Sequence, residues 1–124
     1  TKVCKAARTG RKEVELLGTG EPRRQYMYSY DFAAILMELI QRKELPSVMN
    51  AGPPENITIR ELAEKIVDAV GYSGLNLKFN SDYPDGQMRK DLDSTVLKRV
   101  IGDFEFTSLD EGLRKTYEWY LQQH

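Results

Sequence analysis

The feature that most constrains this fold is one amphipathic helix, at residues 58–70, whose two ends can both be located in the sequence. Thr58 and Glu61 have the spacing of a capping box, in which each side chain accepts the other residue's backbone N–H. Gly71 follows as the left-handed residue that commonly ends a helix. One face is apolar: Ile59, Leu62, Ala63, Ile66, Val67 and Val70. Such a helix needs cover on that face, so the chain must build a core around it.

Further helices and short strands are predicted around this one. The helical patterns cover residues 32–40, 94–100 and 108–121, the last with a second capping box at Ser108 and Glu111. The β-type runs are residues 12–18, 24–29, 47–51 and 75–80. The fold class is therefore α/β or α+β, with three to four helices and several short strands.

Residues 18–22 (GTGEP) separate the first two β-type runs. Glycine and proline at this density are typical of a turn, so the segment predicts either a hairpin or a tight corner. Residues 1–10 have the pattern of the last turns of a helix that ends at Gly10, and no methionine begins them. We therefore expect residues 1–124 to form a single domain cut from a longer chain.

Composition excludes several classes of protein. A formal net charge of −1 provides no general attraction for nucleic acid or an anionic membrane. Cys4 is the one cysteine, so it forms no internal disulfide, which favours a reducing compartment. No apolar run approaches the length of a membrane span, and no signal-peptide pattern opens the sequence. These observations predict a cytoplasmic protein.

Residues for catalysis are missing. The one histidine, His124, is the final residue and is expected to be a frayed end, so no Ser-His-Asp, Cys-His or His-based metal site is predicted. Gly18 and Gly20 begin like a dinucleotide fingerprint, but no third glycine follows at the required spacing. We therefore predict no catalytic residue, no cofactor-binding residue and no metal ligand on this chain.

Two basic clusters are the remaining candidates for a binding site. They are Arg23–Arg24 with Tyr26 and Tyr28, and Arg89–Lys90 after the turn at residues 82–86. An arginine fork fits phosphate oxygens and a lysine adds a point charge, so the two clusters together could hold a diphosphate. The alternative is that these side chains are solvated or pair with neighbours such as Asp31 and Asp91.

Four segments resemble a known family. Residues 18–33 (GTGEPRRQYMYSYDFA) resemble the segment G-x-G-x-x-x-R-x-F/Y-x-Y/H-V-x-D-L-A of nucleotide-sugar epimerases and dehydratases of the extended short-chain dehydrogenase family, with Ser29 in place of valine. Residues 50–66 fit the turn and capped helix of the same family. Residues 84–93 (PDGQMRKDLD) and 108–120 (SLDEGLRKTYEWY) are similar to motifs of GDP-L-fucose synthases.

The resemblance covers nearly the whole chain but only the last third or so of such an enzyme. It implies a C-terminal substrate-binding part without a complete Rossmann fold, in which Arg24 and Lys90 face the diphosphate of a GDP-sugar. It also implies that the NADP(H) site and the catalytic residues lie upstream, in an N-terminal Rossmann domain. The complete enzyme would epimerise GDP-4-keto-6-deoxy-mannose at C3 and C5 and reduce C4 with NADPH.

Two other interpretations stay open. The chain could belong to another nucleotide-sugar epimerase, reductase or dehydratase, or be a stand-alone interaction module derived from this fold. In the family, the segment like residues 30–51 packs on the nucleotide-binding domain. Without that domain the apolar helix at residues 32–40 would be uncovered, so we predict self-association of the isolated chain.

Overall fold

The computed structural model describes residues 1–123, so the prediction for His124 falls outside the described residues. The elements are α1 (Lys2–Thr9), β1 (Glu13–Leu17), β2 (Arg23–Arg24), α2 (Ser29–Ile40), β3 (Ile57–Thr58), α3 (Ile59–Val70), β4 (Asn76–Asn80), α4 (Thr95–Ile101) and α5 (Leu109–Gln123). The strands form two two-stranded sheets, so the prediction of a mixed fold with short strands is confirmed.

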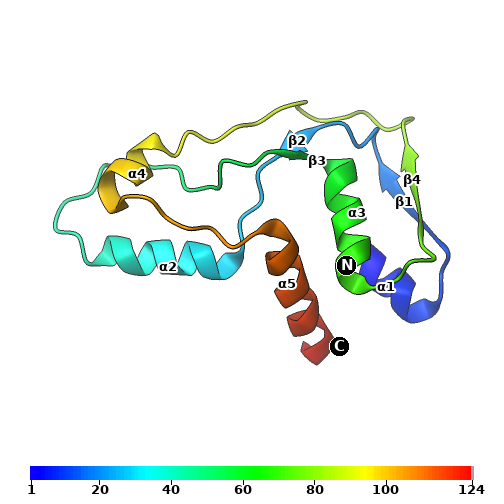
Figure 1. Ribbon diagram of the computed structural model, residues 1–124. Helices are drawn as coiled ribbons and strands as arrows, with labels where there is room; N and C mark the ends of the chain where they lie inside the picture. The colour runs from blue at the N-terminus through cyan, green and yellow to red at the C-terminus, as the bar shows by residue number, and fades with distance from the viewer. Residues whose placement is uncertain (124) are drawn as a thin grey trace.

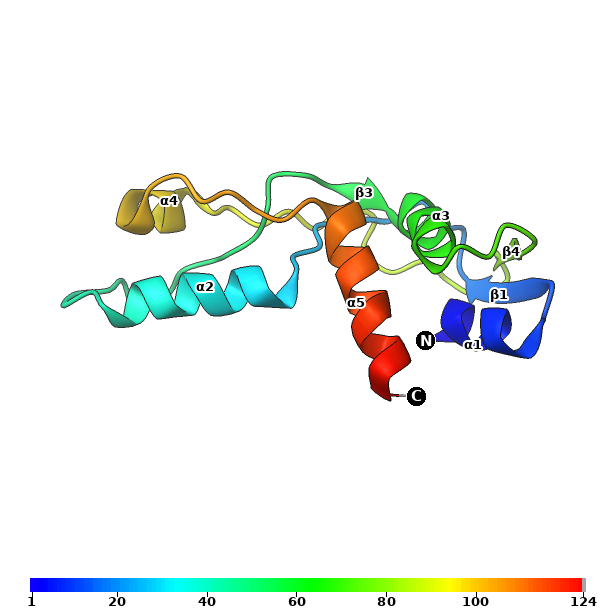
Figure 2. The same cartoon turned by 60° about the horizontal axis from the view of Figure 1, so that its bottom comes forward.

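The molecule is elongated (Figure 1). Helices α2 and α4 lie at one end, α1, β1 and β4 lie at the other, and α3 and α5 lie between them. Figure 2 shows the same order after rotation, with α5 projecting away from the extended segments that connect the two ends. Contacts of α3 with α1 and α5 make α3 the central packing element.

The predicted start and stop signals of α3 are confirmed. Thr58 Oγ1 accepts the N–H of Glu61 at 3.0 Å, and Glu61 Oε2 accepts the N–H of Thr58 at 2.7 Å. Gly71 ends the helix with φ of 70°. At the start of α5, Ser108 Oγ accepts the N–H of Glu111 at 3.3 Å. The buried apolar residues are Val3, Cys4, Ala6, Val14, Ile35, Ala63 and Leu97.

Strand β1 pairs with β4 in parallel, from Glu13↔Asn76 to Leu17↔Asn80, while β2 pairs antiparallel with β3. The hairpin prediction is therefore wrong, and the tight corner is what forms. Gly18 and Gly20 both have φ of 85°. The corner then joins the start of α3, because the N–H of Arg60 donates to the carbonyl of Gly20 at 3.0 Å. This bond directs the chain away from β1 and toward β3.

Two predicted strands are also corrected. Of the run at residues 24–29 only Arg24 lies in a strand, β2, and residues 47–51 form no strand. Val48 is 78% exposed. A strand requires a neighbour to complete its backbone hydrogen bonds, and the described part of the chain offers none beside residues 47–51.

Helix α2 buries little of its apolar surface. Only Asp31 and Ile35 are buried. Its exposed large apolar side chains are Tyr30, Phe32, Leu36, Met37 and Ile40. The expected uncovered apolar helix is therefore present within the described residues.

Candidate functional site

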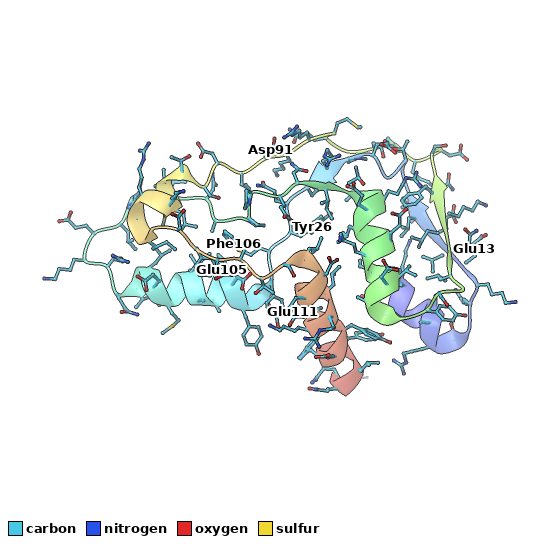
Figure 3. All side chains as sticks on the ribbon, in the orientation of Figure 1. Glu13, Tyr26, Asp91, Glu105, Phe106 and Glu111 are labelled. Carbon is cyan, nitrogen blue, oxygen red and sulfur yellow. The ribbon has the colours of Figure 1, made fainter. Side chains whose placement is uncertain are left out.

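The two basic clusters meet at strand β2. On one side β2 pairs with β3, through Arg23↔Thr58. On its other side, Arg23 forms a parallel bridge with Arg89, and the N–H of Arg23 donates to the carbonyl of Met88 at 2.7 Å. Figure 3 shows this second segment through Asp91, which lies on the chain running alongside β2 and β3. The backbones of both clusters are thus in direct contact.

The bridge also determines which side chains share a face. Residues that bridge in a parallel pair point to the same side, and successive side chains point to opposite sides. Arg23 and Arg89 therefore share one face, and the same alternation, continued by one residue, would place Arg24 and Lys90 together on the other. This is the arrangement that a diphosphate contacted by both residues requires.

The two faces differ in their charge partners. Arg23 donates to the carbonyl of Asn56 at 2.8 Å and lies 4.0 Å from a carboxylate oxygen of Glu61. Arg89 forms an ion pair with Asp91 at 2.6 Å. The first basic residue of each cluster is therefore already engaged with an acceptor of this chain.

Arg24 and Lys90 lack such partners. Arg24 donates through NH1 to the carbonyl of Arg23 at 2.6 Å, and neither Arg24 nor Lys90 has a carboxylate partner among residues 1–123. Asp31, suggested as a neutralising neighbour, instead accepts the N–H and the hydroxyl of Thr107 at 2.8 and 2.7 Å. Arg24 is half-buried and Lys90 is exposed, so both charges remain accessible to an anion.

Tyr26 lies two residues beyond Arg24 and is half-buried. Burial raises the pKa of its phenol, and the nearby Arg24 charge opposes that rise. Tyr26 also lines a cavity of about 310 Å3 together with Pro53, Ile57 and Phe106. Figure 3 shows Tyr26 and Phe106 in the middle of the molecule, near the start of α5. The lining of this cavity does not include Arg24 or Lys90.

One part of the site was missed from the sequence. The turn at residues 82–86 was interpreted only as a turn, yet its Gly86 lies against Arg24, where an added Cβ would be 3.8 Å from NH2. Asp85 accepts two hydrogen bonds from Thr19. The signal that could have found them is the P-D-G motif itself, which only Gln87 and Met88 separate from the second basic cluster.

Other kinds of site find little support in the described residues. Among residues 1–123, no group of three or more His, Cys, Asp or Glu side chains is placed to hold a metal ion. In the same range, no helix is long and apolar enough to cross a bilayer. Cys4 is buried in α1, which makes it a packing residue.

Comparison with known proteins shows which family the chain resembles. The NAD dependent epimerase/dehydratase family matches residues 1–52. GDP-L-fucose synthase 1 of Arabidopsis thaliana is 38% identical over 91% of this chain and 34% of its own length. The Escherichia coli K12 GDP-L-fucose synthase is 37% identical over 89% of this chain and 36% of its own. The chain is therefore similar to members of the NAD dependent epimerase/dehydratase family.

The fold agrees with this similarity. A crystal structure of a GDP-L-fucose synthetase from Naegleria fowleri bound to NADP superposes with a TM-score of 0.90 at 27% identity. It covers 98% of this chain, which in turn covers 38% of that protein. The chain thus spans about a third of the length of the relatives that it matches. The predicted resemblance to GDP-L-fucose synthases and the predicted fold class are both confirmed.

Proposed function

We propose that this chain is the GDP-sugar-binding part of a GDP-L-fucose synthase, and that Arg24 and Lys90 hold the diphosphate of the substrate. One observation carries the proposal: these two residues directly follow the bridged pair Arg23 and Arg89, and they are the two basic cluster residues without a carboxylate partner in the described chain. The names of the most similar relatives support a GDP-sugar as the ligand.

The chemistry of the pair suits a diphosphate. The planar guanidinium of Arg24 can donate two parallel hydrogen bonds to one phosphate, and the Lys90 ammonium adds a compact charge for the other. Each charge-assisted bond contributes about 1.5–3 kcal/mol. Because the site is open to solvent, added salt should weaken binding.

The reaction of the complete protein follows from the same resemblance. We propose 3,5-epimerisation of GDP-4-keto-6-deoxy-mannose followed by reduction at C4 with NADPH. The glycine corner of this chain does not fit the pyrophosphate of NADP, because the Thr19 N–H is already bonded to the carboxylate of Asp85 at 2.9 Å. That N–H is not available to a pyrophosphate. We therefore assign residues 1–124, as one domain, to substrate binding and no step of proton or hydride transfer to them.

A titration of the complete protein with GDP tests the proposal. Arg24→Ala should weaken GDP binding roughly tenfold to a hundredfold, which corresponds to about 1.5–3 kcal/mol for the charge-assisted contact of its guanidinium. Lys90→Ala should weaken it less, because an ammonium gives up one point contact. Arg23→Ala is the matched control, since its guanidinium is engaged by Asn56 and Glu61 and should leave GDP affinity unchanged.

Two results would contradict the proposal. GDP affinity that is the same with and without Arg24 would leave the cluster as a solvated basic surface. Loss of NADP affinity in Arg24→Ala equal to the loss of GDP affinity would indicate general damage. Competition between GDP and UDP separates a GDP-L-fucose synthase from an enzyme of another nucleotide sugar, because the diphosphate is common to both and only the base differs.

We also propose a cytoplasmic location. Cys4 is the only cysteine and is buried, so the chain makes no internal disulfide and suits a reducing compartment. Cell fractionation with an antibody to the complete protein tests this, and recovery of the protein from a secreted or membrane fraction would refute it.

A further inference from the structure

The turn at residues 82–86 is attached to the glycine corner by one carboxylate. Asp85 Oδ1 accepts the backbone N–H of Thr19 at 2.9 Å, and Asp85 Oδ2 accepts the Thr19 hydroxyl at 2.5 Å. Both oxygens of Asp85 are therefore used by a residue that lies 66 positions earlier in the sequence. Hydrogen bonds to an ionised group are about twice as strong as neutral ones, so this attachment is a strong one for an open surface.

The corner is shaped to receive this carboxylate. A Cβ added at Gly18 would lie 2.5 Å from Asp85 Oδ1, which is closer than real Cβ contacts. The absent side chain at Gly18 is thus what lets Asp85 reach the Thr19 N–H. Gly18 therefore has two roles: it lets Asp85 approach the corner, and it adopts the left-handed backbone conformation there.

The attachment sets the path of the chain that follows. Gly86 comes next and lies against the Arg24 guanidinium. Then the carbonyl of Met88 accepts the N–H of Arg23 at 2.7 Å. Lys90 is the second residue after Met88, and the path from Asp85 to it is otherwise exposed. Asp85 is therefore the fixed point from which the second cluster is positioned beside the first.

We infer that Asp85 is a positioning residue of the diphosphate site: by bonding Thr19 it holds the loop so that Lys90 lies beside Arg24. The inference rests on the proposed function, since it assigns Asp85 a role at that site. Asp85 does not touch the anion itself, because both of its oxygens face Thr19.

The experiment measures GDP affinity and thermal stability of the complete protein for variants on both sides of the contact. If Asp85→Ala leaves the loop in place only a tenth of the time, the Lys90 contribution is largely lost and GDP should bind up to about tenfold more weakly. Thr19→Val, which removes only the hydroxyl, should give a smaller loss, and Thr19→Ser should bind as the wild type does. Asp82→Asn is the matched control: it removes a negative charge from the same loop, and its side chain makes no hydrogen bond in the described range.

A Lys90→Ala background distinguishes positioning from a general structural role. In that background Asp85→Ala should cost less than about twofold in GDP affinity, since the residue that it positions is gone, while its effect on melting temperature should be the same in both backgrounds. An equal loss of GDP affinity with and without Lys90 would overturn the inference.

The remaining outcomes separate the two proposals. Unchanged GDP binding in Asp85→Ala, together with weak binding in Arg24→Ala, refutes the role of Asp85 and leaves the diphosphate site standing. Unchanged binding in Arg24→Ala refutes the diphosphate site and, with it, the role of Asp85. If Asp85→Ala fails to fold, Thr19→Val in the two Lys90 backgrounds gives the same comparison.

Discussion

Gly20 lies where the chain leaves β1 for β2, and its substitution gives the sharpest test of the fold. Its φ is 85°, a conformation that L side chains rarely adopt. A Cβ at this position would lie 2.6 Å from Phe79 Cε1 and 2.8 Å from Phe79 Cδ1. The same Phe79 ring carries the Arg60 guanidinium 4.0 Å above its centroid. Gly20→Ala therefore combines backbone strain with a clash that displaces a packed ring.

The two effects can be estimated separately. A left-handed residue with a Cβ costs about 1–2 kcal/mol, and overpacking a filled site costs about 1–3 kcal/mol. Gly20→Ala should therefore lower the free energy of unfolding by roughly 2–5 kcal/mol. Gly71→Ala is the matched control, because Gly71 has φ of 70° but nothing within 4 Å of its Cβ position. Gly71→Ala should therefore lower the free energy of unfolding by the backbone strain alone.

Urea unfolding followed by circular dichroism measures both variants, with the midpoint reporting stability and the slope reporting the surface exposed. Unrelated surface changes alter the free energy of unfolding by about 0.5 kcal/mol. If the losses in Gly20→Ala and Gly71→Ala differ by no more than this, the predicted clash with Phe79 is refuted.

Three further predictions concern the rest of the fold. Asp31→Asn should destabilise the chain by about 1.5–3 kcal/mol in urea unfolding, because the buried carboxylate accepts two hydrogen bonds from Thr107 and an amide can accept only one of them without loss; an unchanged midpoint would contradict this. A hydrogen bond from Arg114 lowers the pKa of Glu111 from 4.5 to about 2, so its contribution to stability is present above pH 4.5 and is lost as pH falls toward 2. Glu111→Gln should flatten the dependence of stability on pH in that window, and an identical pH profile would refute the assignment. The isolated chain should self-associate through the exposed face of α2, light scattering should show species larger than a monomer, and Ile40→Lys should reduce them; a compact monomer at high concentration would count against it.

The sequence predicted the helices well because their signals are local. The capping box of Thr58 and Glu61 and the left-handed Gly71 lie within or beside the helix that they bound, so no distant partner decides them. Strand pairing is different, since the partner of β1 comes 63 residues later and nothing in residues 13–17 encodes it. The same reason explains the absent strand at residues 47–51, whose composition fits a strand but which has no neighbour in the described chain.

The candidate site was likewise predicted from the sequence only in part. Two basic clusters and the resemblance predicted Arg24 and Lys90, but the residues alone could not show that the clusters touch. That contact depends on the bridge between Arg23 and Arg89, 66 residues apart. Asp85 escaped notice because a carboxylate after a proline is ordinary turn chemistry, and only its bonds to Thr19 distinguish it.

The parallel pairing of β1 with β4 has a consequence for the time course of folding. Closing the loop from Glu13 to Asn76 costs roughly 3–4 kcal/mol of chain entropy beyond a constant, because the cost rises as (3/2)RT ln n. No hairpin can nucleate this sheet early, so its formation must wait until the intervening helices have brought the two strands together. On the ribosome, β1 therefore remains an unpaired edge until β4 has emerged, which makes residues 13–17 a segment for a chaperone to shield.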